Sequence, residues 1–288
     1  MSPAALRARA EALAQPLPPL LAEARQLAAS IQLGEHGRRR PGMGDAFWQY
    51  RPAMQGDPAR AIDWRRSARS DQHFVQEKEW QAAQSVVFWV DRSAAMQFAA
   101  EDRVTKADRA AVLGLALASL LVRGGERVGL SDMPNPPQAG DLQVERMARL
   151  LMAEEEAEYG EPRLTQLPRH GRAVFLSDFL GPIEAVEAAL ARATDRGLSG
   201  ALLQVLDPVE EAFPFSGRTL FHSMSGGMRH ETREAADLRE AYQERLAARK
   251  AALAALAASH GWRFHTHHTG DAPAAALLWL YHAMERQR

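Results

Sequence analysis

The sequence predicts an α/β fold: a doubly wound, mostly parallel sheet of the Rossmann type, preceded by an N-terminal helical and irregular extension. Two observations lead to this prediction. From residue 85 onward, short apolar runs alternate with longer segments of helical periodicity, as in parallel sheets that helices cover on both faces. Before residue 80 this alternation is absent. We therefore divide the chain into an extension, residues 1–80, and an α/β domain, residues 81–288.

The extension has two predicted parts. Residues 3–33 have a helical pattern that prolines 16, 18 and 19 interrupt, because proline cannot donate a backbone hydrogen bond inside a helix. Residues 34–71 are rich in glycine, arginine and aromatic side chains and lack a clear period. We therefore expect irregular structure in this second part.

The α/β domain is predicted to contain five strands. Most of them are continuous apolar runs of strand length, which is typical of strands that are covered on both faces. The predicted strands are 85–91, 127–131, 173–178, 200–207 and 262–267.

Helical segments separate these strands. Gly124 and Gly261 stand where two of the helices should end. Pro273 begins the last helix, where the missing N–H of proline costs no hydrogen bond because the first N–H groups of a helix have no partner within it. We expect a loop over 133–140 and irregular structure over 208–230. The predicted helices are 105–123, 142–157, 181–196, 232–259 and 273–288.

The composition of the 288 residues excludes several classes of function. The chain has no cysteine, which excludes disulfides, thiolate catalysis and cysteine-bound zinc. A formal net charge of −1 gives no overall reason to expect nucleic acid or an acidic membrane as the partner. No apolar run reaches about 18 residues, so we predict no membrane span. The N-terminus lacks the apolar core of a signal peptide, and we expect a cytoplasmic protein.

Three of the predicted strands end in an acidic residue. Asp91, Asp178 and Asp207 stand at carboxyl ends, where ligands bind in doubly wound sheets. Ser93 follows Asp91 by two residues, so a carboxylate and a hydroxyl share one strand-to-helix turn. Oxygen ligands suit Mg²⁺, which keeps several waters and needs only one or two carboxylates. We therefore predict a metal site around Asp91 and Ser93, with Asp178 at the same end of the sheet.

An ordered string of residues resembles a known family. Two stretches closely resemble the signature of family 58 of the domains of unknown function: Gly56-Asp-Pro-Ala-Arg-Ala-Ile-Asp-Trp64 and Val75-Gln-Glu-Lys-Glu79. A later stretch, Asp207-Pro-Val-Glu210, resembles another part of it, and the resemblance covers about residues 30–285. It implies a von Willebrand factor A-like domain and frequent pairing with a MoxR-type AAA+ ATPase. Many members carry transmembrane helices, which this sequence lacks.

The resemblance also implies a metal-ion-dependent adhesion site, whose usual pattern is Asp-x-Ser-x-Ser with a Thr and a second Asp from later loops. Asp91 and Ser93 match the first two positions, and Asp178 matches the second Asp. Position 95 is alanine, which removes one hydroxyl ligand. Thr165 stands before the predicted strand 173–178 and not after it, so no residue is assigned as the Thr ligand. We interpret the site as degenerate, with Mg²⁺ as the candidate ion. The alternative is that the acids only cap helix N-termini.

We predict a non-enzymatic protein-interaction module without catalytic residues, which acts as an accessory or adaptor of a MoxR-type AAA+ ATPase. A bound metal would complete its coordination with a carboxylate of the partner. A metal-dependent hydrolase that uses the same acids is an alternative. It would need a general base, and neither His nor Glu adjoins Asp91 or Asp178 in the sequence.

A nucleic-acid binder is the second alternative. Residues 35–70 contain eight Arg against four acidic residues, a local net charge of +4, with aromatic residues between them. We favour internal ion pairs in this segment, because Arg and Asp placed along an irregular backbone commonly bind each other. The expected pairs join Arg51, Arg60 and Arg69 to Asp57 and Asp63.

The chain has one histidine cluster, formed by His265, His267 and His268. The first two would share one face of the last predicted strand and offer two ligands to a transition metal. No third ligand stands nearby at a typical spacing, so we interpret the cluster as polar surface.

Overall fold

The structure is a computed structural model, which describes residues 18–35, 47–54, 62–68, 72–78, 83–100, 102–153, 155–165 and 167–284. Its contacts divide the chain into two compact units. Residues 35–83 form the small unit, and the remainder of the chain forms the large unit. Each unit is treated by itself below.

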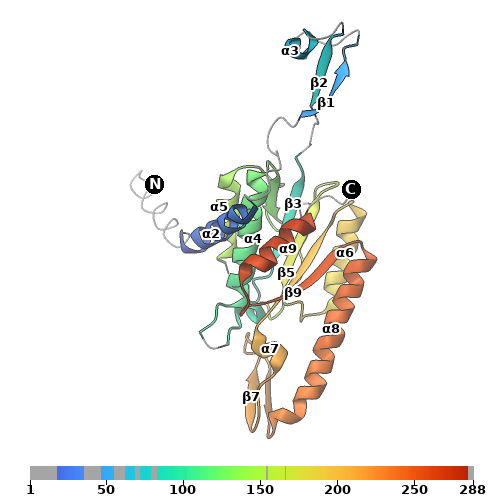
Figure 1. The fold of residues 1–288 in the computed structure, drawn as a ribbon. Helices are drawn as coiled ribbons and strands as arrows, with labels where there is room; N and C mark the ends of the chain where they lie inside the picture. Colours follow the sequence, from blue (N-terminus) through green and yellow to red (C-terminus); the bar gives the residue numbers. More distant parts are fainter. Residues whose placement is uncertain are drawn as a thin grey trace, which may run out of the picture. The chain divides into compact units, whose positions relative to one another are not determined.

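The large unit is built on a five-stranded sheet in which every pair of neighbours is parallel. The strand order is β4-β3-β5-β6-β9, and Figure 1 shows strands β3, β5 and β9 of this sheet. This confirms the predicted parallel sheet and all five predicted strands. Their bounds are β3 Ser85–Val90, β4 Arg127–Leu130, β5 Arg172–Ser177, β6 Ser199–Leu206 and β9 Arg263–His268.

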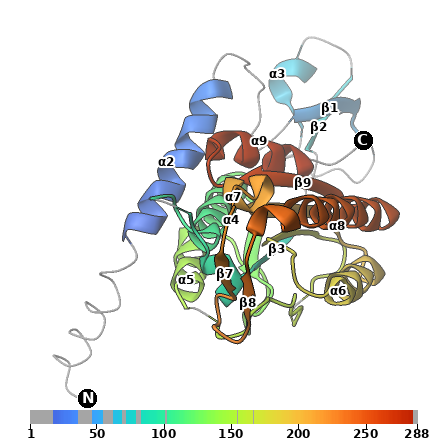
Figure 2. The ribbon, with the colours of Figure 1, turned by 90° about the horizontal axis from the view of Figure 1, so that it is seen from below.

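Helices cover both faces of this sheet (Figure 2). Helices α2, α4, α5 and α9 pack on one face, and α6 and α8 pack on the other. None of the helices in the described ranges is long and apolar enough to span a bilayer. Their bounds are α2 Pro18–Glu35, α4 Lys106–Arg123, α5 Asp141–Leu151, α6 Ile183–Asp195, α8 Arg239–Ser259 and α9 Pro273–Met284.

Strand β3 shows why both faces are apolar. Successive side chains of a strand point to opposite faces, so Val86 and Phe88 enter the core under α4, whereas Val87 and Trp89 enter the core under α6 and α8. Helix α4 lies close to β3: a Cβ added to Gly114 would stand 3.3 Å from a methyl of Val90. Strand β3 is therefore a continuous apolar run, because its side chains enter an apolar core on each face of the sheet.

Two predicted helix boundaries are wrong. Helix α5 ends at Leu151 and not near residue 157, because the backbone carbonyls of Ala157 and Glu158 accept hydrogen bonds from the turn after β3. The segment predicted as one helix from 232 begins with strand β8, Arg229–Thr232, and a 3-10 turn, η3 Ala235–Leu238, before α8.

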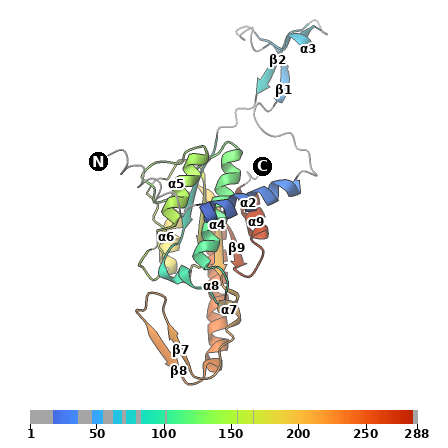
Figure 3. The same ribbon diagram turned by 90° about the vertical axis from the view of Figure 1, so that its left-hand side faces the viewer.

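Residues 208–230 are not irregular, as we predicted, but contain helix α7 Pro208–Ala212 and strand β7 Thr219–His222, which pairs antiparallel with β8. Helix α7 begins with a capping box. The Asp207 carboxylate accepts the Val209 N–H at 2.9 Å, and the Glu210 carboxylate accepts the Asp207 N–H at 2.8 Å. The β7–β8 hairpin projects from the end of the sheet where α7 lies (Figure 3).

The small unit also has more regular structure than we predicted. Strand β1, Phe47–Pro52, pairs antiparallel with β2, Phe74–Lys78, and a short helix, α3 Trp64–Ser67, lies between them in the chain. Asp63 caps that helix by accepting the Arg66 N–H at 3.0 Å. Of the predicted ion-pair partners, Asp57, Arg60 and Arg69 lie outside the described residues.

Helix α2 belongs to the large unit, although the sequence groups it with the N-terminal extension. Its residues Leu21, Ala24 and Ala28 are buried in the same core as α4. These positions are spaced by three and four residues, so they form one apolar stripe of the helix. Residues 1–17, the first part of the predicted helical segment, lie outside the described residues.

The three clustered histidines have separate partners, and the interpretation of the cluster as polar surface is wrong for His267, which is buried. His265 stacks on Trp279 with 5.0 Å between ring centroids, and His268 Nε2 lies 2.7 Å from a Glu211 carboxylate oxygen. His267 is buried, with its Nε2 3.3 Å from the Arg109 guanidinium. Burial, followed by the charge of Arg109, lowers the pKa of His267 from 6.5 to about 4.

This depressed pKa predicts a loss of stability in mild acid. Below pH 6.5 the unfolded chain takes up a proton at His267, whereas the folded protein does so only near pH 4. Folding stability therefore falls across this window, by up to about 3 kcal/mol from this group. Urea unfolding at pH 7, 5.5 and 4 should show a shallower fall for His267→Gln than for the wild type. Parallel profiles of the two proteins would contradict the assignment, and His230→Gln, an exposed hairpin histidine, is the control.

Candidate functional site

The candidate site lies where the strand order of the sheet reverses. The chain passes from β3 to β4 on one side, and from β5 to β6 and β9 on the other, so the switch point falls between β3 and β5. Ligands of doubly wound sheets bind beyond the carboxyl ends of the strands at this point. Asp91 follows β3 and Asp178 follows β5, so topology brings these two predicted residues to the same place.

Asp91 is 2% exposed, and each of its carboxylate oxygens accepts a hydrogen bond. Oδ1 accepts the N–H of Ser93 at 2.9 Å, and Oδ2 accepts the hydroxyl of Ser177 at 2.6 Å. Burial, which removes water from the carboxylate, raises the pKa of Asp91, and the charge of Asp178 adds to this effect. The predicted neighbours Asp91 and Ser93 are therefore in contact.

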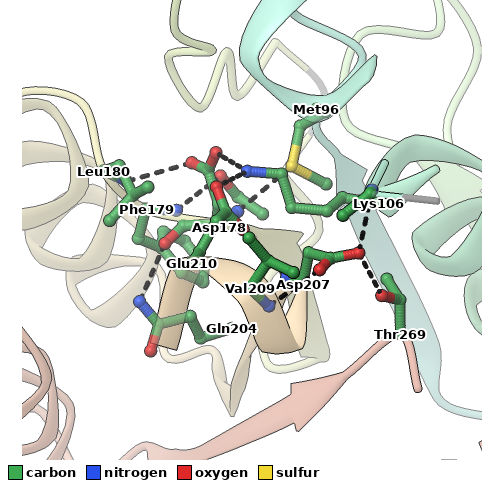
Figure 4. Close-up of polar contacts among 12 residues, drawn as sticks. Met96, Lys106, Asp178, Phe179, Leu180, Gln204, Asp207, Val209, Glu210 and Thr269 are labelled. Atoms are coloured by element: carbon green, nitrogen blue, oxygen red, sulfur yellow. Dashed lines mark hydrogen bonds and ion pairs between the residues drawn. The ribbon is translucent and has the colours of Figure 1, made fainter. Parts of the chain in front are cut away.

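Asp178 is equally buried and has a different set of donors. Its Oδ1 accepts a hydrogen bond from the Leu180 N–H at 3.0 Å, and its Oδ2 accepts one from the Lys106 ammonium at 2.8 Å (Figure 4). Its backbone carbonyl accepts the Gln204 amide at 2.8 Å. The predicted metal ligand Asp178 is thus one half of a buried ion pair.

Lys106 is the functional-site residue that sequence reasoning missed. Its side chain is 1% exposed, and its ammonium lies 2.8 Å from Asp178 Oδ2 and 2.7 Å from Glu210 Oε1. The ring of Phe98 lies 5.7 Å from the same ammonium. Burial alone would lower the pKa of Lys106, but the two carboxylates outweigh it and raise the pKa above 10.5. Lys106 is therefore a permanent cation inside the domain.

Asp207 belongs to a second, adjacent charge pair. Its carboxylate is fully buried and accepts hydrogen bonds from Arg103 Nε at 3.2 Å and from the Thr269 hydroxyl at 3.1 Å. Burial opposes the charged form, but the hydrogen bonds from Val209 N–H and Arg103 outweigh it and lower the pKa of Asp207. All three strand-end acids are therefore held by donors of the protein itself.

A segment of chain, residues 155–160, covers Asp91. A Cβ added to Gly160 would stand 2.2 Å from Asp91 Oδ1, so only glycine allows this approach. The side chain of Arg92 holds the cover segment by binding the Glu155 carboxylate at 2.7 Å, and the Arg92 carbonyl accepts the Glu155 N–H at 3.1 Å. Glu158 in turn accepts the N–H of Ser225, at the tip of the β7–β8 hairpin, at 3.0 Å.

The backbone after Asp178 is strained. Phe179 has a φ of 50°, in the left-handed region that bulky residues rarely adopt. The Ser177 hydroxyl accepts the Phe179 N–H at 2.9 Å, and Arg249 Nε donates to the Phe179 carbonyl at 2.7 Å. These bonds hold the turn that aims Asp178 at Lys106.

The remaining predicted positions have ordinary structural roles. Ala95, at the position where the adhesion-site pattern has serine, is buried. Thr165 donates its hydroxyl to the carbonyl of Ser131, which follows β4, at 2.7 Å. Thr165 is thus engaged at the end of the neighbouring strand.

A hydrated Mg²⁺ at Asp91, Ser93 and Asp178 would need space for its water ligands and carboxylates that no other cation occupies. Gly160 takes the space against Asp91, and an ion on Asp178 would face the Lys106 ammonium. Within the described ranges no group of three or more His, Cys, Asp or Glu could hold a metal ion. The metal site stays a prediction, and this arrangement does not fit a hydrated divalent ion.

One observation favours a missing ligand: the buried hydroxyl of Ser93 has no hydrogen-bond partner. This property does not single out Ser93, because other buried polar atoms share it. They are Ser131 Oγ, Arg92 Nε and Trp262 Nε1.

Comparison with known proteins adds a family but no activity. The model of a family described as "Protein of unknown function DUF58" matches residues 49–252. Similar proteins, each described as uncharacterized, occur in Mycobacterium bovis and in two strains of Mycobacterium tuberculosis. Each is 27% identical over 238 residues, which cover 77% of this chain and 74% of the relative.

Proposed function

Since the chain belongs to the DUF58 family, whose description states no function, we propose a function from its site: it is a non-enzymatic protein-interaction module. The observation that carries this proposal is the closed charge network at the switch point. Asp178 and Glu210 share the buried Lys106 ammonium, and Asp91 and Asp207 are satisfied by neighbouring donors. Such a network fixes the loops at the carboxyl ends of the strands and leaves partner binding to the outer surface of the domain.

The burial of the acids argues against the hydrolase alternative. A hydrolase needs a base that reaches water or substrate, within hydrogen-bond distance of the proton it removes. Asp91, Asp178 and Asp207 are each 2% exposed or less, and their oxygens accept hydrogen bonds from the protein. This supports a structural role for them, in which they fix the loops that carry the binding surface.

The surface we propose for the partner is the outer part of the β7–β8 hairpin, here called the hairpin surface: Leu220, Met224 and Met228. These residues are 43%, 45% and 62% exposed, and all three belong to one short hairpin. Methionine is flexible and polarisable, so it adapts to the shape of a partner. Ser225 connects this hairpin to Glu158 in the cover segment, and so to the candidate site.

We take the partner to be a MoxR-type AAA+ ATPase, and the domain to be von Willebrand factor A-like. Both identities come from the family resemblance of the sequence. The sheet order and the acids at its switch point are compatible with such a domain. In this proposal the ATPase docks on the hairpin surface, and the domain acts as its accessory or adaptor.

Removing the apolar side chains of the hairpin tip tests this proposal. We expect Met224→Ser combined with Met228→Ser to weaken binding of the MoxR-type ATPase by about 10–100-fold, because buried apolar anchors dominate interface energies. Biolayer interferometry on the purified full chain measures this change. Leu142→Ser is the control, because it removes an exposed leucine, 55% exposed, from α5. Equal binding by the hairpin variant and the wild type would refute the docking surface.

A further inference from the structure

We infer that the Lys106 ammonium is the resident cation of the candidate site and supplies the positive charge beside Asp178 that a divalent ion would otherwise bring. The site is then complete without Mg²⁺ or Mn²⁺. This inference concerns the chemistry of the site and holds whichever partner docks on the hairpin surface.

The geometry around the ammonium is that of a cation site. Two carboxylate oxygens from different elements converge on Lys106 Nζ, Asp178 Oδ2 at 2.8 Å and Glu210 Oε1 at 2.7 Å. Lys106 is 1% exposed and Asp178 is 1% exposed, so water does not screen their attraction. A buried lysine is stable only when such charges compensate it.

Glu210 is positioned for this role by the start of its own helix. Its Oε2 accepts the Asp207 N–H at 2.8 Å, as part of the capping box, while its Oε1 accepts the Lys106 ammonium. Both oxygens of this carboxylate are therefore engaged by donors of the protein. Lys106 thereby joins the first turn of α4 to the end of β5 and the start of α7 (Figure 4).

A divalent ion would have to displace this arrangement. Mg²⁺ keeps several waters in an octahedral shell, and the Gly160 backbone already lies against Asp91. An ion bound to Asp178 would also repel the ammonium on the same carboxylate. Because two like charges about 4 Å apart repel each other, and more strongly where water is excluded, binding of a second cation is disfavoured while Lys106 stays in place.

Titration of the purified full chain with MnCl₂ and MgCl₂ by isothermal calorimetry tests the inference. The wild type should give no saturable heat of Mn²⁺ binding up to several millimolar. Ser93→Ala is the diagnostic variant, because it removes only the hydroxyl oxygen of a predicted metal ligand, and circular dichroism checks that the variant is folded. Ser131→Ala is its match, another buried hydroxyl without a partner that is not a predicted ligand.

Each outcome decides the question. Absence of saturable Mn²⁺ binding supports the resident ammonium. Saturable binding that weakens about tenfold or more in Ser93→Ala, and not in Ser131→Ala, would overturn it. Saturable binding that is the same in all three proteins places the metal elsewhere and leaves the ammonium as the cation of this site. None of these outcomes depends on the ATPase. Failure of the docking proposal would appear only in the interferometry experiment on the hairpin variant.

Discussion

Replacing Lys106 by methionine is expected to lower the free energy of unfolding by about 3–5 kcal/mol, because it leaves buried carboxylates without their cation. Asp178 and Glu210 would then face each other without a positive charge between them. Methionine keeps most of the apolar volume of the lysine chain, so the loss reports the charge and not a cavity. Urea unfolding followed by circular dichroism at pH 7 measures the difference.

Lys250→Met is the control for this substitution. Lys250 pairs with Glu211 at a partly exposed site, where the carboxylate is 42% exposed, and such pairs contribute about 1 kcal/mol or less. Adding Asp178→Asn to Lys106→Met should recover part of the stability, since it removes one of the uncompensated charges. If Lys106→Met loses no more stability than Lys250→Met, the ammonium does not hold the site together.

Gly160→Ala is expected to destabilise the domain by about 1–3 kcal/mol and to loosen the cover segment. The added Cβ would lie 2.2 Å from Asp91 Oδ1, so the backbone has to move away from Asp91. This movement would lengthen the hydrogen bonds from Ala94 and Ala95 to the cover segment. Hydrogen exchange of these two amides should therefore become faster, and unfolding experiments should show the loss of stability.

Gly227→Ala provides the comparison for this change. Gly227 lies at the tip of the hairpin, where an added Cβ meets only the Ser225 hydroxyl, at 3.5 Å. A surface change of this kind alters stability by about 0.5 kcal/mol or less. Equal stabilities of the two glycine variants, with unchanged exchange at Ala94 and Ala95, would show that the cover segment is not packed on Asp91.

The parallel sheet could be predicted because its strands are buried on both faces. Runs such as Val86–Val90 and Ala173–Leu176 have no polar alternation, which is typical of strands in the middle of a parallel sheet that helices cover on both faces. The β7–β8 hairpin was missed because its strands have four residues each and none of these residues is buried, so hydrophobic periodicity gives no signal there. The strands of the small unit, of six and five residues, are also short.

The site was predictable in part. Asp91 and Asp178 end buried strands, so topology alone places them together. Lys106 follows the cap residue of an apolar helix, a position that usually faces solvent. Its partners stand 72 and 104 residues away in the chain, so only the packing of α4 against β5 and α7 reveals it. The start of α7 could have been predicted from the sequence, because Asp207 and Glu210 have the spacing of a capping box.

A crystal structure of the full chain grown with millimolar MnCl₂ is the most direct test of the central claim. We expect the Lys106 ammonium between Asp178 and Glu210, as the distances of 2.8 and 2.7 Å describe, and no anomalous Mn²⁺ peak beside Asp91 or Ser93. An anomalous peak within bonding distance of Ser93 Oγ, with the Lys106 side chain turned away from Asp178, would contradict the account.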